Sequence, residues 1–322
     1  MISALLAEQP DWGFYETARV LRFVLLLTWL HFNMTRSLWF AIVAGFVVAI
    51  AVQSALGTVQ VVLKADRNLL SIFGVAGEQV FNDSGELDII ENRARGTLGH
   101  PNYIAPYLLL FIPAILGALL YSRVRLTRWA CIGLLAIAVA CLVATKSRIP
   151  IALGVLGLGA VVVIAVRERM LSLRVAVGGA IFALLLATAA AIPYAEAIRE
   201  RIVGDFSASI SVRAQYNKTA LTVWDDAPLF GIGPNNGIIG LKRHSELFAW
   251  LARDLESKSE GIAIRAIAPV HNVYLLILSE NGIFGLVGFI VLLAAMLWRA
   301  VVAALVSSGA IRGMFIGLSV AL

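Results

Sequence analysis

The chain has 322 residues, of which 60% are hydrophobic and only 14% are charged, and its formal net charge is +6. A soluble domain usually carries about a quarter charged residues, so the composition excludes a soluble enzyme and a disordered chain. Cys131 and Cys141 lie in one apolar block, about 15 Å apart along a helix, too far for a disulfide. The composition therefore indicates a membrane protein.

Apolar blocks recur along the chain, most of them near the 20 or so residues that cross a bilayer core. We predict spans at 17–34, 38–63, 102–121, 129–145, 149–166, 174–193 and 272–298. An eighth block begins at Gly313 and stops at Leu322, which is about half a bilayer of helix. We therefore expect a truncated chain that ends inside a span.

The positive charge is concentrated in the short loops on one side of the predicted membrane. Loops 35–37, 122–128, 167–173 and 299–312, with Arg174 at their edge, hold nine arginines and one acid, Glu168. The positive-inside rule makes this side cytoplasmic. The excess positive charge thus indicates how the chain is oriented in the membrane, and we expect no nucleic-acid partner. The amino terminus then falls outside, which missing upstream spans or a surface-lying segment 1–16 would explain.

The predicted fold class is all-α, a polytopic transmembrane helical bundle with a large helical periplasmic loop. Its first part covers 1–193, with about six spans and an outer loop at 64–100. The periplasmic loop covers 194–271 and contains short helices. The last part covers 272–322, with one complete span and one truncated span.

The tight outer turn Thr145-Lys146-Ser147-Arg148 is unusual, because short outer loops normally avoid lysine and arginine. Pro150 suits a helix start there. Lys146 and Arg148 are either anchors for lipid phosphates or part of a site for a phosphorylated substrate. This turn alone does not separate the two interpretations.

A second polar group precedes the span at 102–121. His100, Pro101 and Asn102 have the pattern of a helix start, which is the favoured interpretation. Arg93 and Arg95 lie just upstream and add positive charge.

The large loop contains further elements. Residues 207–224 are predicted helical, with Arg213 on one face, and Asp225-Asp226-Ala227-Pro228 ends that helix. A glycine turn follows at 231–237, and 241–255 forms an amphipathic helix.

His271 and Asn272 stand where the loop re-enters the membrane, and Glu280 follows about two turns later. A histidine at this boundary is more often a structural cap. His271 is nevertheless the best general-base candidate among the four histidines, and Asn272 and Glu280 are candidates to orient it. His31 and His244 have no obvious partner. The sequence lacks the His/Cys patterns of a zinc site.

These pieces, in their order, resemble the O-antigen ligase and polymerase family of bacterial membrane glycosyltransferases. The matching motifs are Arg95-Gly96-Thr97-Leu98-Gly99-His100-Pro101-Asn102, Thr145-Lys146-Ser147-Arg148, Ser211-Val212-Arg213, Ala227-Pro228-Leu229-Phe230-Gly231-Ile232-Gly233-Pro234-Asn235, His271-Asn272-Val273-Tyr274-Leu275 and Glu280-Asn281-Gly282-Ile283-Phe284-Gly285.

The resemblance implies a GT-C-like enzyme in the bacterial inner membrane with its active site facing the periplasm. Such enzymes move a glycan from an undecaprenyl-pyrophosphate carrier to a hydroxyl acceptor, either a lipid A–core sugar or another glycan. It places the pyrophosphate-binding arginines at Arg148 and Arg213 and the catalytic histidine at His271. Lys146 and Asn272 are then further substrate-binding candidates, and Arg95, His100, Asn102 and Glu280 supporting ones. No metal or cofactor is implied.

Two alternatives remain at this stage. A transporter or flippase of lipid-linked sugars would explain the spans and the arginines equally well, although it predicts midplane charges and repeated halves, neither of which is evident. A structural membrane subunit would not explain why Lys146 and Arg148 stand in a tight outer turn.

Overall fold

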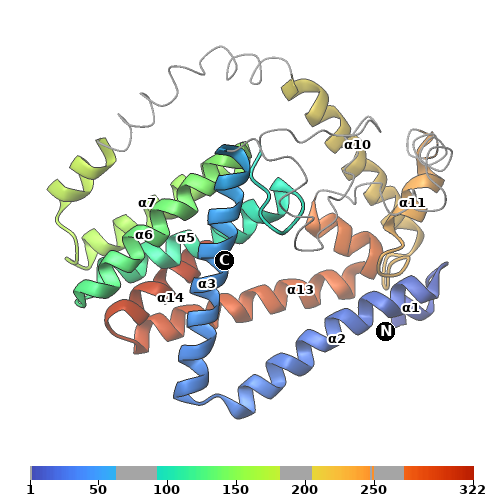
Figure 1. Ribbon diagram of the computed structural model, residues 1–322. Helices are drawn as coiled ribbons and strands as arrows, with labels where there is room; N and C mark the ends of the chain where they lie inside the picture. The colour runs from blue at the N-terminus through green and yellow to red at the C-terminus, as the bar shows by residue number, and fades with distance from the viewer. Residues whose placement is uncertain (1, 63–92, 182–204, 247–248, 250–271) are drawn as a thin grey trace. The chain divides into compact units, whose positions relative to one another are not determined.

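The computed structural model describes residues 2–62, 93–181, 205–246, 249 and 272–322 (Figure 1). In these ranges every regular element is a helix, which confirms the predicted all-α class. Five of the described helices are long and apolar enough to cross a membrane, so the chain is a multi-pass membrane protein. They are α3 (Arg36–Val62), α5 (Pro101–Tyr121), α6 (Arg125–Ala144), α7 (Arg148–Arg167) and α13 (Val273–Val306).

Three other predicted spans have different outcomes. The block 17–34 falls in α2 (Pro10–Asn33), which is not among those five helices and carries four charged residues: Asp11, Glu16, Arg19 and Arg22. The block 174–193 is described only to residue 181 and is helical there. The terminal block falls in α14 (Gly309–Ala321), a short apolar helix.

Two sequence-based boundaries were wrong. The predicted loop 299–312 is mostly helical, because α13 continues to Val306 and α14 begins at Gly309. Arginine side chains can reach water from a helical backbone, so Arg299 does not mark a loop. The predicted helix 241–255 is interrupted, since α11 (Gly237–His244) ends before Ser245, whose backbone is extended. Most of the remainder lies outside the described residues.

The chain divides into two compact units, and each is described by itself. The first comprises residues 1–35, 80–88 and 193–292, and the second comprises 36–79, 89–192 and 293–322.

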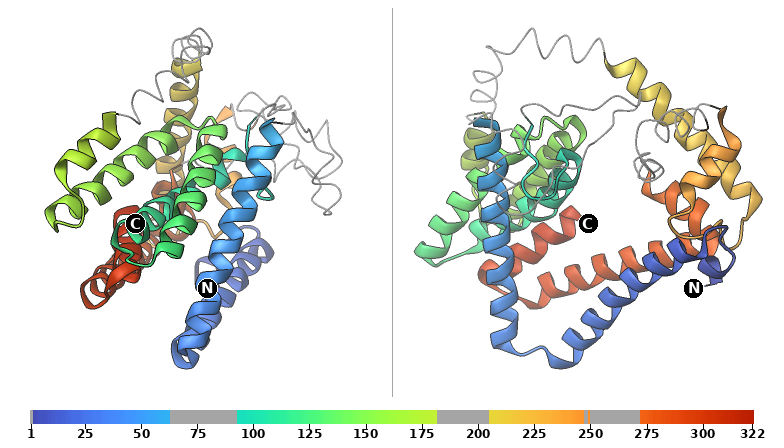
Figure 2. Two further views of the ribbon diagram at one scale, coloured as in Figure 1. Left: turned by 60° about the vertical axis from the view of Figure 1, so that its left-hand side comes forward. Right: turned by 45° about the vertical axis from the view of Figure 1, so that its right-hand side comes forward.

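Helices α5, α6 and α7 of the second unit lie side by side (Figure 2). The core of this unit forms around α5, whose residues Ile104, Leu108 and Ile112 are fully buried. Residues of α3, α6 and α7 pack on this helix. Glycines allow α5 and α14 to approach each other very closely, because a Cβ on Gly117 of α5 would lie 1.9 Å from the carbonyl oxygen of Gly313 of α14. Small residues of this kind let membrane helices pack backbone to backbone.

The first unit holds α1 (Ile2–Leu5), α2, α10 (Asp205–Asp226), α11 and the start of α13. Tyr216 and Ala220 of α10 and Leu241 of α11 form a small buried cluster, on which Leu275 and Leu276 of α13 pack. The helix predicted at 207–224 is thus confirmed as α10, which ends at Asp226 as the Asp-Asp-Ala-Pro sequence indicated.

Candidate active site

The segment before α5 is tied to α3 by two glutamine side chains. The Gln60 side-chain oxygen accepts hydrogen bonds from the backbone N–H groups of Gly96 at 3.0 Å and Arg95 at 3.3 Å. Its amide donates to the Gly96 carbonyl at 3.1 Å. Gln53 accepts from the N–H of Thr97 at 2.9 Å and also donates to the Thr97 hydroxyl. These bonds hold the backbone that carries Arg95.

The turn between α6 and α7 is built on a buried threonine. Thr145 is fully buried and its hydroxyl donates to the Leu142 carbonyl at 2.6 Å, while accepting from the N–H of Ser147 at 3.3 Å. Lys146 has a positive φ of 52°, and Arg148 is the first residue of α7. Lys146 and Arg148 are exposed, whereas Thr145 and Ser147 are buried. The turn therefore presents both cations to the surface from a fixed base.

Arg93 joins these two segments. Its Nε donates to the Thr145 carbonyl at 2.8 Å, and its Nη2 donates to the Ser147 hydroxyl at 3.1 Å. The N–H of Ala94 donates to the Ala144 carbonyl at 2.9 Å. Arg93, Arg95, Lys146 and Arg148, which we call the basic cluster, thus lie on two cross-linked segments, 93–102 and 145–148, that contain no acidic residue.

His100 and Asn102 belong to the start of α5. The Nδ1 atom of His100 accepts a hydrogen bond from the N–H of Asn102 at 2.9 Å, and Pro101 is the first helical residue. This confirms the predicted helix start and gives His100 a capping contact. The Ser147 hydroxyl donates to the side-chain oxygen of Asn102 at 3.4 Å, so Asn102 contacts the turn that carries Arg148.

In the first unit, the glycine turn docks onto a kink in α13. Gly282 has a non-helical backbone with φ 67° and ψ −169°, which frees carbonyls before the kink and N–H groups after it. The N–H of Ile232 donates to the Ser279 carbonyl at 3.0 Å, and that of Gly233 donates to the Glu280 carbonyl at 2.9 Å. Gly231 has φ 69°, and a Cβ there would lie 2.3 Å from the Glu280 backbone. The glycines of this turn thus permit close docking and are not a nucleotide loop.

The Glu280 carboxylate completes this docking. Its two oxygens accept hydrogen bonds from the backbone N–H groups of Asn235 and Gly237, each at 3.0 Å. Gly237 is the first residue of α11, where an acidic group stabilises the helix dipole. Glu280 therefore acts as a structural cap that joins the glycine turn to α13.

Replacing Glu280 by alanine should loosen the glycine turn, because two backbone N–H groups lose their side-chain acceptor. Two hydrogen bonds worth about 0.5–1.5 kcal/mol each correspond together to roughly 10- to 100-fold faster local amide exchange. Hydrogen–deuterium exchange of peptides covering 232–240 measures this change. Glu246→Ala, which removes an exposed carboxylate on the same loop, is the matched control. Unchanged exchange in Glu280→Ala would contradict the capping role.

The remaining candidates lie at the start of α13 and on α10. The side-chain oxygen of Asn272 accepts from the N–H groups of Tyr274 at 3.0 Å and Leu275 at 3.3 Å, so it caps α13. His271 precedes this cap and lies outside the described residues. Arg213 is half-buried on α10, one turn before Tyr216. Within the described residues its Nε is buried and has no hydrogen-bond partner.

Some contacts could not be anticipated from the sequence. His244, for which no partner was expected, pairs with Asp226 at 2.6 Å. Asn236 exchanges hydrogen bonds with the backbone of Gln9, and the Ser3 hydroxyl donates to the Glu280 carbonyl at 2.8 Å. The amino-terminal segment is thus fastened to the glycine turn within the first unit.

The comparisons with known proteins agree with this architecture. The family model described as O-antigen ligase matches residues 132–290. The match covers just under half of the chain. No curated protein matches the chain. This match confirms the predicted resemblance. The family is one of membrane enzymes of the O-antigen ligase and polymerase type.

The O-antigen ligase segment contains most of the candidates but not all of them. The turn with Lys146 and Arg148, Arg213, Asn272 and Glu280 fall inside it, as does His271, whereas Arg95, His100 and Asn102 precede it. In the second unit the structure brings Arg95, Asn102, Lys146 and Arg148 onto two cross-linked segments. Arg213, Asn272 and Glu280 belong to the first unit.

Sequence reasoning missed the residues that hold these segments: Gln53, Gln60 and the cross-linking role of Arg93. In the sequence, the only signal was that polar glutamines stand inside an apolar block. Among the described residues, no group of three or more His, Cys, Asp or Glu side chains is placed to hold a metal ion.

Proposed function

We propose that this protein is a glycosyltransferase that moves a glycan from an undecaprenyl-pyrophosphate carrier to a hydroxyl acceptor. The acceptor is a lipid A–core sugar in a ligase and another glycan chain in a polymerase. The observation that supports the proposal is the basic cluster, whose four cations lie at the ends of apolar spans on two cross-linked segments that contain no acidic residue of their own. A lipid-linked diphosphate presents its charge at that depth of a bilayer.

The chemistry suits this arrangement. The acceptor oxygen attacks the anomeric carbon of the donor glycan, and the bond from that carbon to the diphosphate oxygen breaks. The diphosphate leaves with the electron pair and gains negative charge. Arginine binds phosphate bidentately and stays charged at every physiological pH. In the proposal Arg148 and Arg213 stabilise this charge in the transition state, which is usually the largest catalytic contribution.

The proton of the attacking hydroxyl goes to His271 in this scheme. General-base catalysis of this kind contributes about 10² to 10⁴ in rate. Asn272, the next residue in the chain, caps the start of α13 by accepting hydrogen bonds from the N–H groups of Tyr274 and Leu275. Lys146 and Arg95 add positive charge around the carrier diphosphate. No metal takes part in the proposed reaction.

The proposed location of the reaction is the periplasmic face of the bacterial inner membrane. The arginine-rich segments 122–128, which includes the first turn of α6, and 167–173 lie at the ends of α6 and α7 opposite the basic cluster. By the positive-inside rule, we propose that these segments face the cytoplasm and the cluster faces outward.

Transfer by the purified protein in proteoliposomes tests the proposal. The donor is a lipid-pyrophosphate glycan, the acceptors are a lipid A–core and a free glycan chain, and a chelator is present throughout. We expect one molecule of undecaprenyl pyrophosphate released per glycan transferred. Movement of the donor across the bilayer without cleavage of its glycosyl bond would instead identify a flippase. The preferred acceptor separates ligase from polymerase.

A further inference from the structure

The second unit has a pocket of about 810 Å³ at the ends of its helices remote from the basic cluster. It is lined by the connection between α5 and α6, the end of α7 and the connection between α13 and α14. Arg148 begins α7 while the pocket lies at that helix's far end, beside Glu168. The pocket is therefore separated from the basic cluster by the length of a span.

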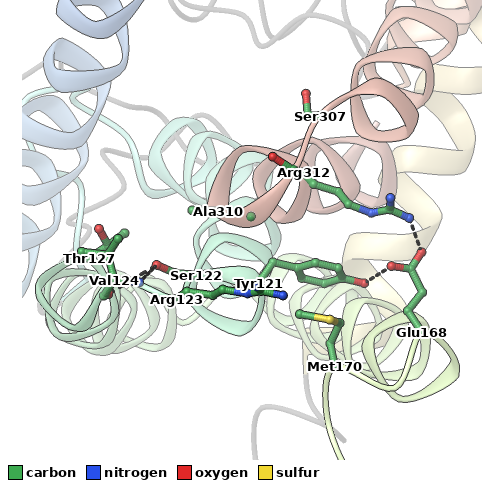
Figure 3. A pocket seen from close by; sticks show the side chains of 12 residues that line it. Tyr121, Ser122, Arg123, Val124, Thr127, Glu168, Met170, Ser307, Ala310 and Arg312 are labelled. Carbon is green, nitrogen blue, oxygen red and sulfur yellow. Dashed lines mark hydrogen bonds and ion pairs between the residues drawn. The ribbon is translucent and has the colours of Figure 1, made fainter.

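Charged side chains line the pocket, as Figure 3 shows. Arg312 donates from Nη2 to one oxygen of Glu168 at 2.9 Å, and the Tyr121 hydroxyl donates to the other oxygen at 2.9 Å. Arg123 is the third charged lining residue, which leaves a balance of two positive charges and one negative charge. Glu168 accepts from only part of the Arg312 guanidinium, because within the described residues the Arg312 Nε is buried without a hydrogen-bond partner.

Two helix starts add to the positive potential of the pocket. Val124 precedes α6 and Ser308 precedes α14, and both line the pocket. In the described chain neither residue makes a side-chain capping bond to its helix. The amino-terminal ends of helices of this length attract anions and favour phosphate in particular.

Apolar side chains are exposed at and near the pocket. Val124 and Met170 line it and are 60% and 42% exposed, and Trp129, one turn into α6, is 63% exposed. Exposed aromatic residues at the ends of spans mark the interface between the acyl chains and the headgroups. A ligand here would thus meet cations and lipid-facing apolar residues together.

We propose that this pocket binds the phosphate headgroup of an anionic phospholipid, with its acyl chains along Val124 and Met170. A volume of this size is typical of sites for small molecules. Arg123 and the two helix starts contact the phosphate, and Arg312 is held beside it by Glu168. The proposal does not rest on the transferase activity, because the pocket and the basic cluster are at opposite ends of the same helices.

Lipid binding to the purified protein in detergent tests the site, with native mass spectrometry as the readout. The probes are phosphatidylglycerol, the zwitterionic phosphatidylethanolamine and soluble glycerol phosphate. We expect Arg123→Ala to weaken phosphatidylglycerol binding about tenfold. Glu168→Gln should strengthen it, because the one negative charge of the pocket is lost. Arg123 is exposed, so its replacement leaves the fold intact.

Arg128→Ala is the matched control, since Arg128 is an exposed arginine on α6 that does not line the pocket. Equal lipid binding by Arg123→Ala and the unchanged protein would overturn the proposal, and so would an equal loss in Arg128→Ala. Displacement of the lipid by glycerol phosphate at equal concentration would show that the site takes a soluble phosphate instead.

Discussion

Replacing Arg148 by alanine should slow glycan transfer by about 10² to 10³-fold, which is the usual cost of losing one preorganised group that stabilises transition-state charge. The fold should not change, because Arg148 is exposed while the turn beneath it is held by Thr145, Ser147 and Arg93. The initial rate of transfer from the lipid-pyrophosphate donor measures the effect.

Two further variants separate charge from geometry at this position. Arg148→Lys keeps the positive charge but loses the planar fork, so it should recover only part of the rate. Arg125→Ala removes an exposed arginine at the far end of the same bundle and should transfer normally. A fully active Arg148→Ala protein would remove Arg148 from the proposed site.

Replacing His271 by alanine should lower the rate of transfer by about 10² to 10⁴-fold while donor binding persists, because a general base acts on the acceptor and not on the diphosphate. The equilibrium affinity for the lipid-pyrophosphate donor, measured beside the rate, distinguishes this pattern from that of Arg148→Ala, which should also bind the donor more weakly. His271→Ala with full activity would mean that another group takes the proton.

Local signals in the sequence predicted much of the fold. The His100-Pro101 pair marks the start of α5, Pro150 lies in the first turn of α7, and Asp226-Ala227-Pro228 ends α10. Each of these depends on backbone chemistry within a few residues, namely proline at a helix start, a polar cap or a helix-breaking proline. Such features can be recognised without knowing what the segment packs against.

Contacts between distant segments could not be predicted in the same way. Gln60 and Gly96 are 36 residues apart, and Glu280 and Gly237 are 43 apart. A polar residue in an apolar block signals that it has some partner, because a buried polar group must be hydrogen-bonded, but it does not indicate which one. For this reason the sequence did not indicate that the Glu280 side chain accepts from the N–H groups of Asn235 and Gly237. Its support of His271, which lies outside the described residues, stays a prediction.

The candidate site, too, could be predicted from the sequence only in part. The acid-free segments around Arg95 and Arg148 were visible as separate motifs, but their connection through Arg93 follows only from the structure. The joint action of Arg148, Arg213 and His271 on one substrate stays a prediction, and it is the central claim of the proposed mechanism.

A double-mutant cycle of Arg148→Ala and Arg213→Ala tests that claim most directly. The rate of glycan transfer is measured for the unchanged protein, both single variants and the double variant. Residues that act together on one diphosphate are strongly non-additive, so the double variant should be only slightly slower than the slower single variant. Rate losses that multiply would show that the two arginines act independently, and full activity of either single variant would contradict the mechanism outright.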